Sequence, residues 1–426
     1  MQRRVFSLVP GLLLVPWLLA ASACGGHAVS DAELTAMAKD ARATAERVRG
    51  LKLPDDGSFK EAVASRDELA TYLDERLNAT DAREELLETG RVLEDLGALA
   101  PGTDLAAAWM KAVKDQVAGY YDWEKKTLFL ADWMPRLMQE PILVHETTHA
   151  LQDAHFGLAR FMTPIKGAED AQAAIQALIE GDASLAMAEA LLPKTSEAGR
   201  ELSYSMIIAA AQQQVGQIDA PPVVAESLLF PYAGGMQLAR MAWKRGGWPA
   251  IDRMYDDVPL STEQVIHPEK YLDTPRDLPE RVTLAVPRSL TAAGWKVAYR
   301  GPAGELGWRI VLGPGMDAET AHRAAAGWDG DETVLLEQTP GGPTITLVGS
   351  VWDDETEARE AEAAFARTKV PPRAVVRVGA RVAGVWGEPM DAANALAQEL
   401  VDTMKAREVA TFAALSGPAP AGDLAP

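Results

Sequence analysis

The pentapeptide HETTH, residues 145–149, carries the clearest chemical signal in this sequence. It lies inside an apolar, proline-free run, residues 142–156, which predicts a helix. Because residues four apart share one face of a helix, His145 and His149 can bind the same metal ion, with Glu146 beside the ion rather than on it. Two neutral imidazoles and a carboxylate that can take a proton from water suit a hydrolytic zinc site. Surface histidines on an ordinary helix are the alternative.

Two histidines are too few for a catalytic zinc site, which normally has three protein ligands and a water. Glu180 is the best candidate for the third ligand, because it lies in an apolar, alanine-rich helix predicted over residues 168–192. A carboxylate that faces a core is costly unless it is paired or bound to metal. The adjacent Gly181 costs about 1 kcal/mol in a helix, which indicates a close approach of another helix. Asp182 is the runner-up as a ligand, and an exposed acidic pair is the alternative.

Three further positions are candidates for supporting roles. Asp153 follows His149 by four residues and can orient its imidazole, although a solvated charge is an equal alternative. His267 is the candidate donor for the oxyanion of a peptide-cleavage transition state. Tyr232 and Tyr271 compete for that role, and a purely structural hydrogen bond is the alternative for His267.

The first residues have the order that is typical of a secretory signal: a basic start, an apolar run over residues 5–20, then small residues. The run is short for a retained membrane anchor, and it contains two prolines. Small residues before the only cysteine resemble a bacterial lipobox, which predicts cleavage after residue 23 and lipidation of Cys24. An ordinary signal with an incidental cysteine is the alternative.

The chain is strongly acidic, with a formal charge of −20 that becomes −22 when Arg3 and Arg4 leave with the signal. An acidic surface repels nucleic acid and anionic headgroups, so no nucleic-acid partner is expected. Attachment to the membrane is expected through the lipid at Cys24, since no later stretch is long and apolar enough to span a bilayer. We expect an exported protein anchored in the cell envelope, at the outer or inner membrane on the periplasmic side, or at the cell surface.

Several stretches together resemble one protein family. HETTHALQDAHF is followed about thirty residues later by LIEGDAS, and VAGYYDWEKKTLFL precedes it and STEQVIHPEKY follows. This combination is similar to a group of bacterial and archaeal zinc metallopeptidases of the gluzincin type. The resemblance covers roughly residues 33–275.

The resemblance implies a zincin fold in which His145, His149 and Glu180 bind Zn²⁺ and Glu146 acts as general base. In zincins an edge strand beside the active helix pairs with the extended substrate. The hairpin predicted over residues 119–130 supplies the candidate for that strand, Thr127–Leu130, and the structural alternative is that its aromatic residues only pack the sheet.

The fold class expected is α+β: a mainly helical zincin-like domain with a small sheet, then a C-terminal α+β domain for which a ferredoxin-like arrangement is one candidate. In that C-terminal domain, residues 308–312 are predicted as a strand, and residues 374–386 as another. The expected organisation is a signal (1–23), a tether (24–32), the zincin-like domain (33–278), the accessory domain (279–410) and a disordered tail (411–426).

The function expected is zinc-dependent hydrolysis of peptide bonds, with a peptide or protein as substrate. Two alternatives stay open. One is an envelope lipoprotein without catalytic activity that keeps the zinc-bound scaffold for binding or assembly. The other is a zinc hydrolase that cuts cell-wall amides.

Overall fold

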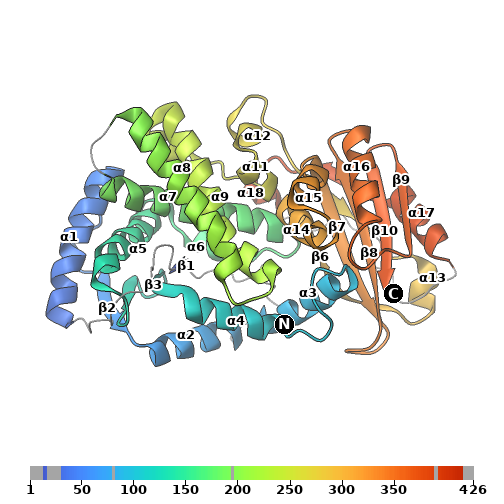
Figure 1. Cartoon of the computed structure of the whole chain (residues 1–426), viewed down its shortest axis with the longest axis horizontal. Helices are drawn as coiled ribbons and strands as arrows, with labels where there is room; N and C mark the ends of the chain where they lie inside the picture. The colour runs from blue at the N-terminus through green and yellow to red at the C-terminus, as the bar shows by residue number, and fades with distance from the viewer. Residues whose placement is uncertain (1–12, 17–29, 79–81, 193–195, 388–391, 416–426) are drawn as a thin grey trace.

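The computed structural model describes residues 13–16, 30–78, 82–192, 196–387 and 392–415. They form two units that lie side by side along the long axis of the molecule (Figure 1). The first unit is mainly helical and the second is built on a larger sheet, so the molecule has the expected α+β composition. Among the described residues, no helix is long and apolar enough to cross a membrane.

The first unit contains a four-stranded sheet in the order β1-β3-β4-β2. Its strands are β1 (Leu13–Pro16), β2 (Lys60–Ala64), β3 (Val117–Asp122) and β4 (Thr127–Ala131). Its longer helices are α1 (Asp31–Arg49), α2 (Arg66–Asn78), α3 (Ala82–Asp95), α4 (Leu105–Gln116), α5 (Arg136–Phe156), α7 (Glu169–Leu191), α8 (Glu197–Gln214) and α9 (Pro222–Gly246). Its short helices are α6 (Ala159–Met162), η1 (Val215–Gln217), α10 (Trp248–Met254), α11 (Thr262–Ile266) and α12 (Pro268–Leu272).

The second unit contains a five-stranded antiparallel sheet in the order β6-β7-β8-β10-β9 and a two-stranded pair, β11-β5. Its strands are β5 (Glu280–Thr283), β6 (Lys296–Gly301), β7 (Trp328–Glu337), β8 (Thr344–Trp352), β9 (Ala374–Val378), β10 (Arg381–Gly387) and β11 (Lys405–Glu408). Its helices are α13 (Arg288–Ala292), α14 (Gly304–Leu312), η2 (Gly313–Gly315), α15 (Ala318–Ala325), α16 (Glu355–Phe365) and α17 (Ala393–Thr403). A last helix, α18 (Phe412–Leu415), follows.

The ferredoxin-like candidate for the second unit is wrong. In a split βαβ unit, strands joined by a helix run parallel with another strand between them. Here the helices α14 and α15 join β6 to β7, and these two strands are direct antiparallel neighbours. Residues 374–386 are a hairpin of two strands rather than one.

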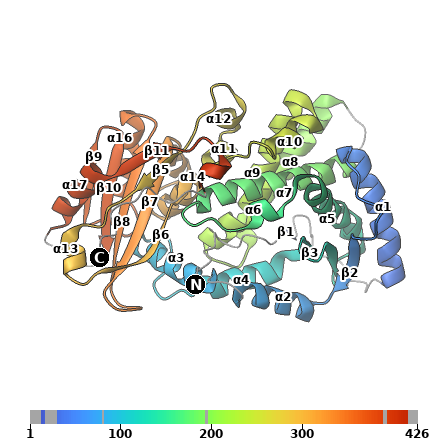
Figure 2. The ribbon, with the colours of Figure 1, turned by 180° about the vertical axis from the view of Figure 1, so that it is seen from behind.

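Side chains alternate between the two faces of the larger sheet, as the period of a strand requires. Leu335, Val348 and Val382 face one core, which also holds α16 and the apolar side chains of α3 and α4. Val334 and Leu347 face the opposite core, with α17. The first of these cores therefore contains residues of both units, and Figure 2 shows α3 of the first unit next to β6 of the second, seen from behind.

The two ends of the chain depart from the expected organisation where they are described. Leu13–Pro16, within the predicted signal, forms β1 and pairs with β3. The helix α1 begins inside the predicted tether, after a capping box at Ser30. In the predicted tail, the ring of Phe412 lies 5.7 Å from that of Phe161, so α18 packs on the first unit. Cys24 and residues 416–426 lie outside the described residues.

Two prolines lie inside helices of the structure rather than at helix ends. Pro141 is in the second turn of α5, and Pro231 is in the middle of α9. The sequence predicts the helix of HETTH only from residue 142 onward, whereas α5 begins before Pro141, at Arg136. A proline removes one helical hydrogen bond, but both residues are buried against neighbouring elements. Tertiary packing therefore outweighs the local cost.

Candidate metal centre

The helix α5 brings the two histidines of HETTH together. The side chains of His145 and His149 are fully buried, and their rings meet edge to face with centroids 4.6 Å apart. Their Nε2 atoms are 2.9 Å apart. The helical spacing predicted from the sequence is therefore confirmed, and both imidazoles are aimed at one point.

The helix α7 supplies the third group, Glu180, as expected. Its Oε2 atom lies 3.1 Å from Nε2 of His145 and 3.4 Å from Nε2 of His149, and its side chain is fully buried. Ligand atoms held about 2.1 Å from a tetrahedral ion lie roughly 3.4 Å from one another. The three atoms therefore form a triangle of the size that a single metal ion can fill. These residues make up a group able to hold a metal.

Two glycines explain how α7 reaches this position. A Cβ atom added to Gly181 would lie 2.1 Å from the backbone of Gly235 in α9, and one added to Gly235 would lie 1.9 Å from the carbonyl oxygen of Ala177. The two helices therefore touch through their backbones, next to Glu180. The close helix approach predicted at Gly181 is confirmed.

Gln152, rather than Asp153, orients the second histidine. The amide Nε2 of Gln152 donates to the carbonyl oxygen of Ile179 and to Oδ2 of Asp182, which leaves its Oε1 as an acceptor. That oxygen lies 2.8 Å from Nδ1 of His149. The proton of the imidazole therefore sits on Nδ1, and the lone pair of Nε2 points into the triangle, as a metal ligand requires.

Asp153 has a different role from the one expected. Its Oδ2 atom accepts a hydrogen bond from the hydroxyl of Tyr121, and its Oδ1 atom accepts one from the backbone of Leu158. It therefore ties the end of α5 to β3 and to the following turn. The spacing of four from His149 placed it near the right face, but the adjacent Gln152 reaches the ring.

Asp182 supports the triangle without belonging to it. Its carboxylate forms an ion pair with Arg49 of α1 at 2.8 Å and accepts hydrogen bonds from Gln152 and from the hydroxyl of Tyr255. Arg49 and Asp182 are both fully buried. The sequence offered only a weak signal for this network, a basic residue in the last turn of α1, and the pairing of α1 with α7 could not be read from it.

Glu146 is a carboxyl group without a hydrogen-bond partner. Both of its oxygens are buried, and no described residue bonds to either. A Cβ atom on Gly119 would lie 3.5 Å from Cγ of Glu146, so β3 passes beside this side chain. Burial, and next the charge of Glu180, raise the pKa of Glu146 well above its ordinary value. A carboxyl group in such surroundings binds a proton more readily than a solvent-exposed one.

The charges of the triangle favour metal ligation. Burial lowers the pKa of His145 to about 4, so its ring is neutral. Burial alone would raise the pKa of Glu180, but the two imidazoles outweigh this effect and hold the pKa below its ordinary value. Two neutral nitrogens and one carboxylate are the donor set of many catalytic zinc sites.

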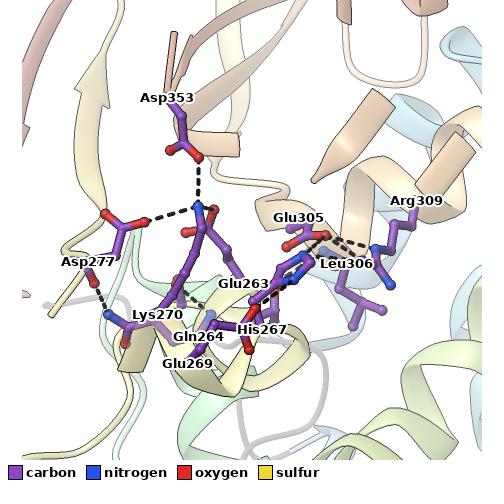
Figure 3. Close-up of polar contacts among 12 residues, drawn as sticks. Glu263, Gln264, His267, Glu269, Lys270, Asp277, Glu305, Leu306, Arg309 and Asp353 are labelled. Atoms are coloured by element: carbon purple, nitrogen blue, oxygen red, sulfur yellow. Dashed lines mark hydrogen bonds and ion pairs between the residues drawn. The ribbon is translucent and has the colours of Figure 1, made fainter. Parts of the chain in front are cut away.

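The structure places His267 in a different cluster. Its Nε2 atom lies 3.1 Å from Oε1 of Glu305 and 3.5 Å from a guanidinium nitrogen of Arg309, both on α14 (Figure 3). His267 therefore joins the two units and is not brought to the triangle. Of its two competitors, Tyr271 donates its hydroxyl to the carbonyl oxygen of Asp257. The ring of Tyr232 lies 6.3 Å from that of His145, and so beside the triangle.

A second group of carboxylates has the composition of a cation site. It consists of Glu263, Asp277 and Asp353. The ammonium nitrogen of Lys270 lies among them, at 2.6 Å, 3.0 Å and 2.7 Å respectively (Figure 3). This group therefore already holds a cation of the protein itself.

The strand expected to bind substrate is in the wrong position. Thr127–Leu130 belongs to β4, which pairs with β3 on one side and with β2 on the other. A strand with two neighbours has no free edge. The strand beside Glu146 is instead β3, whose outer edge pairs with β1.

Comparison with known proteins gives a match only in the second unit. Residues 293–416 are similar to the family described as Domain of unknown function (DUF8575). No curated protein and no solved structure matches the chain. The matched residues contain none of the triangle, so the metal centre stands on its own geometry.

Proposed function

We propose that this protein is a zinc-dependent metallopeptidase. The observation that carries the proposal is the convergence of His145, His149 and Glu180 beside the unpartnered carboxyl of Glu146. Three protein ligands leave a fourth position open, which distinguishes a catalytic zinc site from a structural one with four. The sequence resemblance to gluzincin-type peptidases supports the same conclusion.

The residues divide the chemistry between them. Zinc, when bound, lowers the pKa of water to about 7 and polarises a carbonyl group. Glu146 accepts the proton that the attacking water loses and delivers it to the nitrogen of the departing amine. Its lack of any other partner leaves both carboxyl oxygens available for this transfer. Gln152 keeps the imidazole of His149 in the ligating tautomer.

Tyr232 is the best candidate for the group that stabilises the oxyanion. Negative charge develops on the carbonyl oxygen as the peptide bond is attacked, and a phenol hydroxyl can donate to it. Tyr232 lies on α9, beside His145. It replaces His267, which is engaged with Glu305.

The edge of β3 supports a peptide as substrate. This edge accepts an extended segment, because β1 pairs with it antiparallel, Leu13 opposite Tyr121 and Leu14 opposite Tyr120. Addition of a strand to a free edge is a common way to bind an extended peptide. In a chain that begins at Cys24, the edge of β3 would be open to a substrate passing Glu146.

Export and lipid anchoring at Cys24 remain part of the proposal. They depend on the sequence of the first 24 residues. Mass spectrometry of the protein purified from membranes tests them, since a diacylated cysteine at the new N-terminus gives a defined mass. A chain that keeps residues 1–23, or a free thiol at Cys24, would contradict lipidation.

The test of the mechanism compares four proteins. The wild type is expected to bind about one zinc ion and to cleave an unfolded protein such as casein. Glu146→Gln should keep the zinc but lose activity by about 100-fold or more, because the proton acceptor is gone. Glu180→Gln should lose the zinc. His155→Ala is the control, because this histidine is exposed on the same helix.

Metal analysis and mass spectrometry of the products separate the alternatives. Zinc without cleavage of casein would favour the binding lipoprotein, or the cell-wall amidase if peptidoglycan fragments are cut. Unchanged cleavage by Glu146→Gln would contradict the mechanism. A wild type that binds no zinc would contradict the site as a whole.

A further inference from the structure

A cavity of about 160 Å³ lies where the two units meet. Its walls come from α3, α4, α7 and α9 of the first unit and from β6 and α14 of the second. Figure 1 shows α3 beside α14 and β6 at this junction. Most of the lining is apolar and includes Trp109, Phe230 and Ile310. The cavity is separate from the metal centre, because it is lined by neither Glu146 nor any residue of the triangle, His145, His149 and Glu180.

The ionisable groups of this cavity are acidic. Among the described residues of the lining, Glu85, Glu169 and Asp170 carry carboxyl groups, and none is a lysine, arginine or histidine. A ligand in this space therefore meets negative charge and no compensating positive side chain of the lining. That selects a cation over an anion.

Glu169 offers an unused acceptor. Its Oε1 atom accepts a hydrogen bond from the backbone of Gly167, but its Oε2 atom is buried and has no hydrogen-bond partner. Burial raises the pKa of Glu169 to about 7, as is typical of a carboxyl in apolar surroundings. Asp170 differs, because its carboxylate already accepts from the backbone and hydroxyl of Thr262.

A glycine keeps the space in front of this oxygen open. A Cβ atom on Gly301 would lie 3.0 Å from Oε2 of Glu169 and 2.6 Å from the hydroxyl oxygen of Tyr299. The carboxyl and the phenol therefore converge at one corner of the cavity, against a residue without a side chain. The rest of the space is apolar.

We propose that this cavity binds a small organic amine, a single ring or short chain that carries one ammonium group. A cavity of similar volume in another protein holds one benzene molecule, so the apolar body is limited to about that size. The ammonium group donates to Oε2 of Glu169 and to the hydroxyl of Tyr299. A charge-assisted hydrogen bond of this kind offsets the cost of a buried carboxyl oxygen that has no hydrogen-bond partner. The ligand contacts both units and so favours their association.

Calorimetry with three probes of the same ring tests the proposal. Benzylamine is expected to bind at least about tenfold more tightly than benzyl alcohol, and benzoate is expected not to bind. Glu169→Gln should weaken benzylamine about tenfold and leave benzyl alcohol unchanged. Glu88→Gln is the matched control: Glu88 is a half-buried carboxyl on α3 that does not line the cavity.

A second variant locates the ligand independently of the charge. Ala173 lines the cavity and is half-buried, so Ala173→Leu fills the space from a position that tolerates a larger side chain. It should abolish binding of benzylamine. Equal affinity for the amine and the alcohol, binding of benzoate, no binding of benzylamine, or an unchanged affinity in Ala173→Leu would each overturn the proposal. None of these results depends on zinc or on peptidase activity.

Discussion

The proposed catalytic carboxyl, Glu146, differs from the other buried carboxyl groups around it in whether its oxygens have hydrogen-bond or ion-pair partners. Glu180 faces two imidazoles and Asp182 faces Arg49, whereas the oxygens of Glu146, equally buried, have no hydrogen-bond partner among the described residues. A buried unpaired carboxyl costs several kcal/mol. A fold that has only to hold a metal gains nothing from this cost, which is the physical reason for assigning Glu146 a part in the reaction.

Removal of one hydroxyl group tests the assignment of Tyr232. Tyr232→Phe is expected to lower kcat about 100-fold while KM and zinc content stay close to those of the wild type, because the proposed donor to the oxyanion is lost and the metal ligands are unchanged. Steady-state kinetics and metal analysis measure these quantities. Tyr271→Phe is the control, since its hydroxyl bonds to Asp257. Equal kcat values for the wild type and Tyr232→Phe would rule out this role.

At the scale of elements, the crossing of α7 and α9 sets the position of Glu180. Gly181 and Gly235 allow backbone contact between the helices, and Glu180 immediately precedes the first of them. Any side chain at either position pushes the helices apart. Stability and metal binding are therefore linked at this crossing.

Gly181→Ala is expected to destabilise the protein by about 3 kcal/mol and to weaken zinc binding, because separation of α7 from α9 moves the carboxylate of Glu180. Urea unfolding and a zinc titration measure the two effects. Gly216→Ala serves as the control, because a Cβ atom there meets nothing within 4 Å. A stable Gly181→Ala variant with unchanged zinc affinity would contradict the link.

Local patterns were enough to predict much of the site. His145, His149 and Glu180 follow from helical spacing and from the cost of a carboxylate in an apolar helix. The hairpin of β3 and β4 was also predicted correctly.

The errors arise where tertiary contacts decide. Residues 308–312 were expected to form a strand, but they belong to the helix α14. A short apolar run has no period of its own, and the available signal was the ion pair between Glu305 and Arg309, four residues apart. The neighbours of β4 and the partners of His267 come from residues distant in the sequence, which spacing does not reveal.

At the scale of the whole molecule, carboxyl groups with raised pKa values gather where the two units meet. The group consists of Glu88, Glu169, Asp170, Asp329 and Asp331. Burial raises the pKa of Asp331 to about 6 and that of each of the others to about 7. Such groups bind protons more tightly in the folded chain than in the unfolded chain. The free energy of unfolding therefore falls as the pH rises from about 5 to about 8.

Glu88→Gln isolates one part of this dependence. Burial, then Glu84 and Glu337, raise the pKa of Glu88 to about 7, and Glu337 lies on β7 in the other unit. The variant is expected to be more stable than the wild type by about 1 kcal/mol at pH 8, allowing for partial exposure, and equal to it at pH 5. Urea unfolding at the two pH values measures this. Glu319→Gln, on an exposed position of α15, is the control. A variant that gains no stability at pH 8 would contradict the assignment.

The pairing of β1 with β3 determines when the proposed peptidase activity can begin. Because β1 belongs to the same chain as β3, its effective concentration at that edge is on the order of millimolar. A peptide with a similar affinity for the edge, present at a lower concentration, cannot displace it. Under the proposed function, a chain that retains Leu13–Pro16 is latent. The cut before Cys24 that the sequence predicts would then release this inhibitor at the same moment as it creates the anchor. Activity would begin only after the protein has arrived at its membrane.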